Sequence, residues 1–169
     1  DNNIKNIIDA IESAKSKGIE FLCLPELSVT GYGCQDVFLS DWIYHDSLHF
    51  LSKILPYTKG ISTNIGLPFR YQGKNYNCVV LVSDQKILGV SAKQNLANDG
   101  VHYETRWFNA WPSSELFEVE VLGFQVPFGD VIYKINNTSI AFEICEDAWS
   151  ENRPGARYAK EKVDMILNP

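Results

Sequence analysis

The most informative stretch of the chain reads Ile140-Ala141-Phe142-Glu143-Ile144-Cys145-Glu146-Asp147-Ala148-Trp149. Its apolar run over 140–144 predicts a short strand buried on both faces, and a cysteine follows directly at the strand end. A thiol held there is rigid and can still meet a cleft, which suits a nucleophile because only the thiolate attacks. Free cysteine more often serves as a small buried hydrophobe, so packing is the competing interpretation of Cys145.

Length and composition restrict the class of protein. The chain has 169 residues, of which 45% are hydrophobic, so one domain with a substantial core is expected. A net charge of -6 disfavours a nucleic-acid or anionic-membrane partner, which would require a basic patch. No apolar run is long enough to span a bilayer, and no signal peptide is recognisable. The four cysteines lack zinc-ligand spacing, which favours a reduced, cytoplasmic protein with free thiols.

The chain opens with a pattern typical of a helix followed by a strand. Isoleucines recur on one helical face over 3–17, with Asp1 and Asn2 as candidate caps at the start and Gly18 at the end. The run 19–24 then predicts a buried strand that Pro25 terminates. Glu26 therefore lies just beyond a strand end, where functional groups gather in α/β sheets. The alternative is a solvated loop acid, as most glutamates are.

A second amphipathic helix is predicted over 36–55. Its expected core side comprises Trp42, Leu48, Leu51, Ile54 and Leu55. His45 and His49 are four residues apart on this helix, but no third ligand is evident, so we predict no metal site.

The middle of the chain predicts an antiparallel meander. Strands are expected over 61–69, 76–82 and 86–91, and Lys93 follows the last of them, where a lysine is normally a solvated charge. Residues 94–130 show weak periodicity and many aromatic side chains, most of which we expect to pack.

The end of the chain predicts strands and one short helix. A hairpin over 131–135 and 138–144 leads into Cys145, and a short helix over 154–162 precedes a strand over 163–167.

Glu26, Lys93 and Cys145 thus each follow a predicted strand, and their flanks carry a family resemblance. The blocks Pro25-Glu26-Leu27, Thr30-Gly31-Tyr32, Lys93 with Leu96, and Ile144-Cys145-Glu146-Asp147 resemble the nitrilase (carbon-nitrogen hydrolase) superfamily. The chain is most similar to one branch, the glutaminase domains of glutamine-dependent NAD synthetases. That further similarity rests on Thr30 to Cys34, Leu96 to Gly100, Tyr103 to Phe108 and Val126 to Asp130.

The resemblance implies an αββα sandwich and hydrolysis of the glutamine side-chain amide through a cysteine thioester, with release of ammonia. It assigns the roles of general base, oxyanion stabiliser and nucleophile to Glu26, Lys93 and Cys145. It also implies three further roles. Glu104 would orient the triad, and the backbone N–H of Glu146 would complete the oxyanion hole. Tyr103 would contact the substrate.

The resemblance also implies a larger protein. Residues 1–169 would be a partial hydrolase domain, since the family's domain opens with a further strand and continues past Asn168-Pro169. No cofactor is expected in this domain. An absent synthetase domain of the same full-length chain would use ATP and magnesium, and the whole would form a homo-oligomer.

Other functions compete with this interpretation. The chain could be a stand-alone amidase of the same superfamily, which the block Tyr103 to Phe108 disfavours. It could be a non-catalytic assembly module, which the presence of all three triad residues disfavours. A cysteine-histidine hydrolase with His102 as base is a further alternative, but His102 lies in a predicted loop, whereas Glu26 lies at a predicted strand end.

Overall fold

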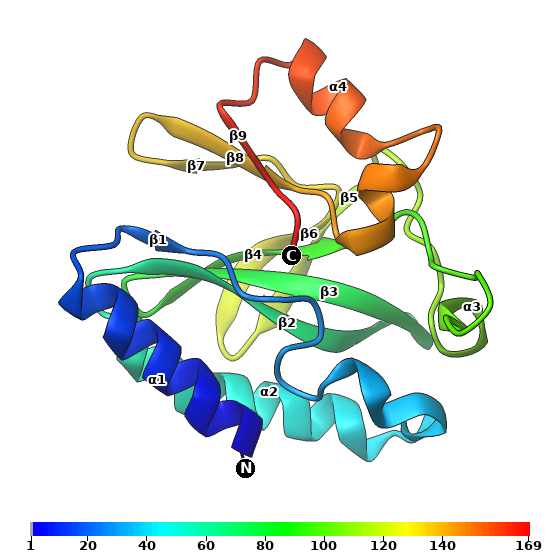
Figure 1. The fold of residues 1–169 in the computed structure, drawn as a ribbon, viewed down its shortest axis with the longest axis horizontal. Helices are drawn as coiled ribbons and strands as arrows, with labels where there is room; N and C mark the ends of the chain where they lie inside the picture. The colour runs from blue at the N-terminus through cyan, green and yellow to red at the C-terminus, as the bar shows by residue number, and fades with distance from the viewer. Residues whose placement is uncertain (1) are drawn as a thin grey trace.

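The computed structural model describes residues 2–169 (Figure 1). Its helices are α1 (Asn2–Ser16), η1 (Tyr32–Leu39), α2 (Trp42–Ile54), η2 (Leu55–Thr58), α3 (Glu104–Trp107), η3 (Cys145–Trp149) and α4 (Pro154–Lys160). Its strands are β1 (Phe21–Leu22), β2 (Ser62–Tyr71), β3 (Lys74–Ser83), β4 (Lys86–Ala92), β5 (Leu116–Val121), β6 (Phe124–Gly129), β7 (Tyr133–Ile135), β8 (Thr138–Phe142) and β9 (Met165–Leu167).

The elements form four layers, which confirms the predicted αββα sandwich. The first sheet has the strand order β1-β2-β3-β4-β6-β5, and the second has the order β7-β8-β9. In Figure 1, α1 and α2 cover the lower face of the first sheet, the second sheet lies above it, and α4 lies outside the second sheet. The two sheets therefore face each other, with helices on the outer side of both.

The first helix forms as predicted. Its isoleucines at 4, 7 and 11 are buried with Ala14, as expected for one helical face. Gly18 follows with φ of 70°, a left-handed conformation that glycine adopts without steric cost. The candidate cap Asp1 lies outside the described residues.

The predicted strand over 19–24 is shorter than expected. Only Phe21 and Leu22 pair with β2, in parallel. Beyond them a side chain replaces the ladder: the Leu24 N–H donates to Asn64 Oδ1 at 2.9 Å, and Asn64 Nδ2 donates to the Leu24 carbonyl at 2.8 Å. The chain therefore leaves the ladder two residues before Leu24 but stays fixed to β2.

The predicted helix over 36–55 is wrong as a single element. Ser40 has extended backbone angles and separates η1 from α2. Trp42, predicted to face the core, is 55% exposed, because the buried stripe of α2 instead contains Ile43, Tyr44, Ser47, Leu51 and Ile54. The adjacent Asp41 pairs with Arg70 on β2 and so holds the start of α2 against the sheet.

The meander forms as predicted, with β2 antiparallel to β3 and β3 antiparallel to β4. Side chains alternate along β3, because successive residues of a strand point to opposite faces. Val80 and Val82 belong to the core under the helices, whereas Val79 and Leu81 pack toward the second sheet. Asn77 shares the face of Val79 and therefore points between the two sheets.

Residues 94–130 are more regular than predicted. They contain α3 and the antiparallel hairpin β5–β6, whose second strand pairs in parallel with β4. Asp36 of η1 holds α3 in place, since its carboxylate accepts hydrogen bonds from Arg106 at 2.6 and 2.7 Å and from Trp107 Nε1 at 2.9 Å.

The predicted packing role of the aromatic side chains is confirmed for Trp111 and Phe128, whose ring centroids are 4.6 Å apart in the core.

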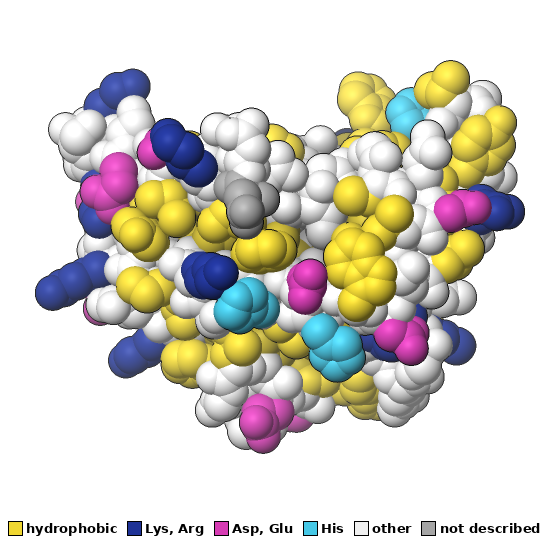
Figure 2. All heavy atoms as spheres, turned by 90° about the horizontal axis from the view of Figure 1, so that it is seen from below, with side chains coloured by type: hydrophobic (Ala, Val, Ile, Leu, Met, Phe, Trp, Pro, Cys, Tyr) yellow, Lys and Arg dark blue, Asp and Glu magenta, His cyan; other side chains and the backbone are white. Residues whose placement is uncertain are grey.

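The last segments confirm the predicted hairpin, helix and strand. β7 and β8 form the antiparallel hairpin that leads to Cys145, and β9 pairs in parallel with β8. The outer face of the helical layer carries hydrophobic side chains interspersed with acids, bases and histidines, without one dominant charge (Figure 2). None of the helices within residues 2–169 is long and apolar enough to cross a membrane.

We predict that Phe128→Ala lowers the free energy of unfolding by about 3–5 kcal/mol, as truncation of a large buried side chain does. Phe128 is fully buried and its ring meets those of Phe69, Tyr71, Tyr76 and Trp111. Urea denaturation followed by fluorescence measures the change.

Phe117→Ala is the matched control, because this ring joins the same cluster but is 43% exposed. Its loss should be clearly smaller, and equal losses in the two variants would contradict the packing described for β6.

Candidate active site

Glu26 lies in a tight loop that is fixed to β2. The Val29 N–H donates to the Gly66 carbonyl at 3.0 Å, and Leu27 has φ of 49°, which non-glycine residues rarely adopt. Gly66 permits this approach, because a Cβ there would lie 2.4 Å from the Leu27 nitrogen. Pairing of β1 with β2 ends at Leu22, three residues before the Pro25 that was predicted to end the strand, and Glu26 follows in this loop.

Lys93 follows β4 directly, and its side chain is completely buried. Its Nζ lies 3.1 Å from Glu26 Oε2 and 2.7 Å from Glu104 Oε2. Burial lowers the pKa of Lys93, but the charges of Glu104 and Glu26 outweigh that effect and leave its pKa raised. Lys93 is therefore a buried ammonium held between two carboxylates, not the solvated charge that its sequence position alone would suggest.

Glu104 is the first residue of α3 and is fully buried. Its Oε2 also accepts the Ala97 N–H at 2.7 Å, and its Oε1 accepts a hydrogen bond from Asn77 Nδ2 at 2.8 Å. The predicted supporting residue thus contacts Lys93 directly and ties the ammonium to both α3 and β3.

Asn77 was missed by the sequence analysis, although it touches both carboxylates. Its Nδ2 lies 2.9 Å from Glu26 Oε2, and the residue is 1% exposed. A polar residue in an otherwise apolar strand, Cys78 to Val82, is the signal that could have found it. Such a residue is buried only when it has hydrogen-bond partners.

Cys145 is half-buried at the start of η3, with φ of 47°. Backbone contacts hold this strained turn: the Cys145 N–H donates to the Pro169 carbonyl at 3.1 Å, and Asn168 Nδ2 donates to the Cys145 carbonyl at 3.1 Å. Cys145 lies three residues beyond the end of β8 at Phe142, and its positive φ is a strained backbone conformation of the kind found at functional sites.

Burial raises the pKa of the Cys145 thiol to about 11. The charge of Lys93 lowers this pKa, whereas the charge of Glu26 raises it. Lys93 and Glu26 thus lie near enough for their charges to influence the thiol, and the cluster comprises these three residues with Glu104. The resting thiol is neutral at physiological pH, so a base must take its proton during attack.

Asp147 is a second residue whose role the sequence analysis missed. It is 1% exposed, and its Oδ1 accepts the N–H groups of Gln94 and Asn95 while Oδ2 accepts the Ile144 N–H at 2.9 Å. Burial raises its pKa to about 6, and these hydrogen bonds oppose the rise. Asp147 connects the turn after Lys93 to the turn that carries Cys145.

The remaining predicted residues lie at the margin of the cluster. Glu146 is in the first turn of η3, where backbone N–H groups have no partner within a helix. Tyr103 precedes Glu104 and is 55% exposed. His102 pairs with Asp99 at 2.8 Å in an exposed position, whereas Glu26 contacts the buried ammonium of Lys93.

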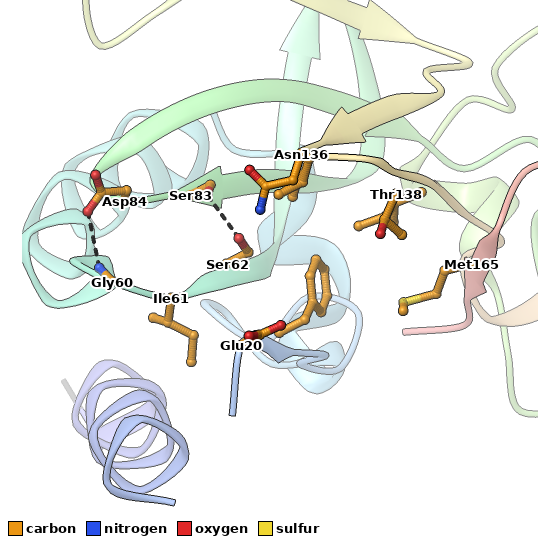
Figure 3. Close-up of a pocket in the computed structure, with 12 residues that line it drawn as sticks. Glu20, Gly60, Ile61, Ser62, Ser83, Asp84, Asn136, Thr138 and Met165 are labelled. Carbon is orange, nitrogen blue, oxygen red and sulfur yellow. Dashed lines mark hydrogen bonds between the residues drawn. The ribbon is translucent and has the colours of Figure 1, made fainter. Parts of the chain in front are cut away.

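A cavity of about 390 Å³ lies elsewhere, between the edge of β2 and the β7–β8 hairpin. Figure 3 shows Glu20, Ser62, Asn136 and Met165 around it, and the cluster residues do not line it. Within residues 2–169, no three His, Cys, Asp or Glu side chains are grouped as a metal site.

The fold and the site together define the class of protein. A four-layer sandwich that gathers a thiol, an ammonium and two carboxylates beside strand ends is the arrangement expected of a nitrilase-type hydrolase. The family model for carbon-nitrogen hydrolases matches residues 1–169, and the chain therefore belongs to the carbon-nitrogen hydrolase family.

Similar sequences point to one group within that family. The glutamine-dependent NAD(+) synthetases of Rattus norvegicus and Homo sapiens are 36% and 34% identical to this chain over 180 residues. These alignments cover 99% of this chain and 25% of each relative, so the chain spans about a quarter of the curated relatives it matches.

Solved structures agree with this placement. A glutamine-dependent NAD(+) synthetase from Cytophaga hutchinsonii superposes with a TM-score of 0.91 and 46% identity, covering 99% of this chain and 27% of that one. An amidase from Nesterenkonia sp. superposes with a TM-score of 0.75 at 16% identity, covering 99% and 58% of the two chains. The amidase comparison supports the fold alone.

We predict that Glu26→Gln lowers the pKa of the Cys145 thiol, because it removes a negative charge that disfavours the thiolate. A drop of about one unit makes alkylation about tenfold faster at a given pH. The measurement is the rate of iodoacetamide incorporation at Cys145, mapped by mass spectrometry between about pH 8 and 10.

Glu12→Gln, which changes an exposed glutamate on α1, is the control and should leave the rate at Cys145 unchanged. An unaltered or slower rate in Glu26→Gln would show that Glu26 does not act on the thiol.

Proposed function

We propose that this chain is a glutamine amidohydrolase unit that releases ammonia from the glutamine side chain for the amidation of deamido-NAD. One observation carries the proposal: the buried contact of Lys93 with Glu26 and Glu104, beside the strained Cys145. The similarity to glutamine-dependent NAD(+) synthetases over nearly the whole chain supports the choice of glutamine among amides.

In the first step Glu26 takes the Cys145 proton while the sulfur attacks the amide carbon. The thiol needs such a base, since burial keeps its pKa near 11. Glu26 then gives this proton to the amide nitrogen, the C–N bond breaks, and ammonia leaves. A thioester between Cys145 and the glutamyl group remains, and the carboxylate is ionised again.

The tetrahedral oxygen of this step requires fixed positive charge. Lys93 is suited to provide it, because its ammonium is buried and its position is set by two carboxylates. The Glu146 backbone N–H in the first turn of η3 is the proposed second donor. Removal of one donor of this kind typically costs roughly a hundred- to a thousandfold in rate.

Hydrolysis of the thioester reverses the proton transfers. Glu26 takes a proton from a water molecule while the water oxygen adds to the thioester carbon. Glu26 then passes this proton to the departing Cys145 sulfur, which restores the thiol. Glutamate is the product. Tyr103, at the exposed approach to Glu104, is proposed to contact the substrate.

The remainder of the proposal concerns the whole protein. A synthetase domain of the same chain would use ATP and magnesium and consume the ammonia, while the hydrolase unit itself needs no cofactor. A cytoplasmic homo-oligomer is the proposed setting, and it follows from the family alone.

We predict that Cys145→Ala abolishes glutamine hydrolysis, because no thioester can form without the sulfur. Release of glutamate and ammonia from glutamine measures this activity. In the full chain, synthesis of NAD from free ammonium should continue, since that step does not require the thiol.

Cys78→Ala is the matched control, because Cys78 is fully buried in β3 and its side chain points away from the cluster. It should reduce stability and retain glutamine hydrolysis. Survival of glutamine hydrolysis in Cys145→Ala would refute the proposal, and loss of both activities would indicate a structural role for Cys145.

A further inference from the structure

Asn77 makes one contact to each carboxylate of the cluster through a single atom. Its Nδ2 donates to Glu26 Oε2 at 2.9 Å and to Glu104 Oε1 at 2.8 Å, so both N–H bonds of the amide are used. The backbone fixes the residue as well, because the Asn77 carbonyl accepts the Lys93 N–H at 2.9 Å. The amide therefore lies at a defined position between the base and its supporting glutamate.

The orientation of this amide follows from electrostatics. A flipped amide would direct its oxygen at two carboxylates, so the NH2 group must face them. In this orientation Oδ1 is buried without a hydrogen-bond partner anywhere in residues 2–169. Such a group costs stability. An asparagine at this position therefore donates to both carboxylates but lowers the stability of the fold through its unpaired oxygen, and such a compromise is typical of functional residues.

The contacts also distinguish the two oxygens of Glu26. Lys93 and Asn77 both donate to Oε2, at 3.1 and 2.9 Å. Within the described part of the chain, 2–169, no side chain or backbone group donates to Oε1. Oε1 is therefore the oxygen that is free to take a proton from Cys145.

We propose that Asn77 is a positioning residue that holds Glu26 by its Oε2 and thereby turns its Oε1 toward Cys145. This inference rests on the proposed function. The titratable groups around Glu26 are Lys93, Glu104, Cys145 and Tyr32.

One ammonium faces two carboxylates in this cluster, which leaves an excess negative charge. Two like charges at one site favour uptake of a proton, and hydrogen bonds to the ionised form oppose it. The Asn77 NH2 group supplies one such bond to each carboxylate. Without it, the Glu26 carboxylate would keep only its contact with Lys93 and could turn away from Cys145.

Two variants of similar size test this role. Asn77→Leu removes both hydrogen bonds, and Asn77→Asp adds a third carboxylate. Both should lower kcat for glutamine hydrolysis by about tenfold or more while KM changes little, with the larger loss in Asn77→Asp, because a misdirected base slows proton transfer and leaves substrate binding intact. A loss confined to kcat would not follow from misfolding.

Ser91→Ala is the matched control, since Ser91 is a buried polar residue whose hydroxyl pairs with Tyr133 at 2.9 Å on the same face of the sheet. It should lower the melting temperature without lowering kcat. An unchanged kcat in both Asn77 variants, or a kcat that falls only in step with melting temperature, would overturn the inference.

A substrate-free measurement separates this inference from the proposed function. The infrared band of the Glu26 carboxylate, assigned by its loss in Glu26→Gln, should shift in frequency in Asn77→Leu at one fixed pH, because Oε2 loses a hydrogen-bond donor in that variant. If that shift occurs but glutamine is not hydrolysed, the proposed function fails and the role of Asn77 stands. If glutamine is hydrolysed but the band does not shift, the inference fails alone.

Discussion

The structure depends on one buried ammonium. Lys93 is inaccessible to solvent, and its charge is balanced by Glu26 and Glu104, which approach from a loop after β1 and from α3. Removing one partner of a buried pair typically costs about 3–5 kcal/mol, because it leaves an uncompensated charge. The same interaction that holds three segments together thus also sets the charges around Cys145.

The sandwich brings these groups together by contacts outside its regular strands. Asn64 and Gly66 fix the Glu26 loop on β2, Asp36 fixes α3 on η1, and Asp147 connects the turns after Lys93 and before Cys145. The strands set the direction in which each segment runs, and these side-chain contacts fix the position of the loops and turns that follow. Positive φ at Leu27 and Cys145 shows that the backbone is strained beside the base and at the thiol.

The sequence predicted the layers, the meander and the position of Lys93 at the end of β4, because hydrophobic runs mark those features directly. It failed where a tertiary contact overrides a local pattern. Asn64 replaces the ladder at Leu24, and Trp42 is exposed because the helix begins there and turns another stripe inward. Asn77 was missed because a single polar residue within a strand becomes meaningful only when Glu26 and Glu104, distant in sequence, are placed beside it.

Covalent labelling tests the central claim most directly, namely that this charged cluster activates Cys145 toward an amide carbonyl. The full chain is treated with a glutamine-like electrophile and then mapped by peptide mass spectrometry. The account predicts stoichiometric labelling of Cys145 alone, prevented by excess glutamine, with Cys23, Cys34 and Cys78 unmodified. Labelling of another cysteine, or labelling of Cys145 that glutamine does not prevent, would contradict it.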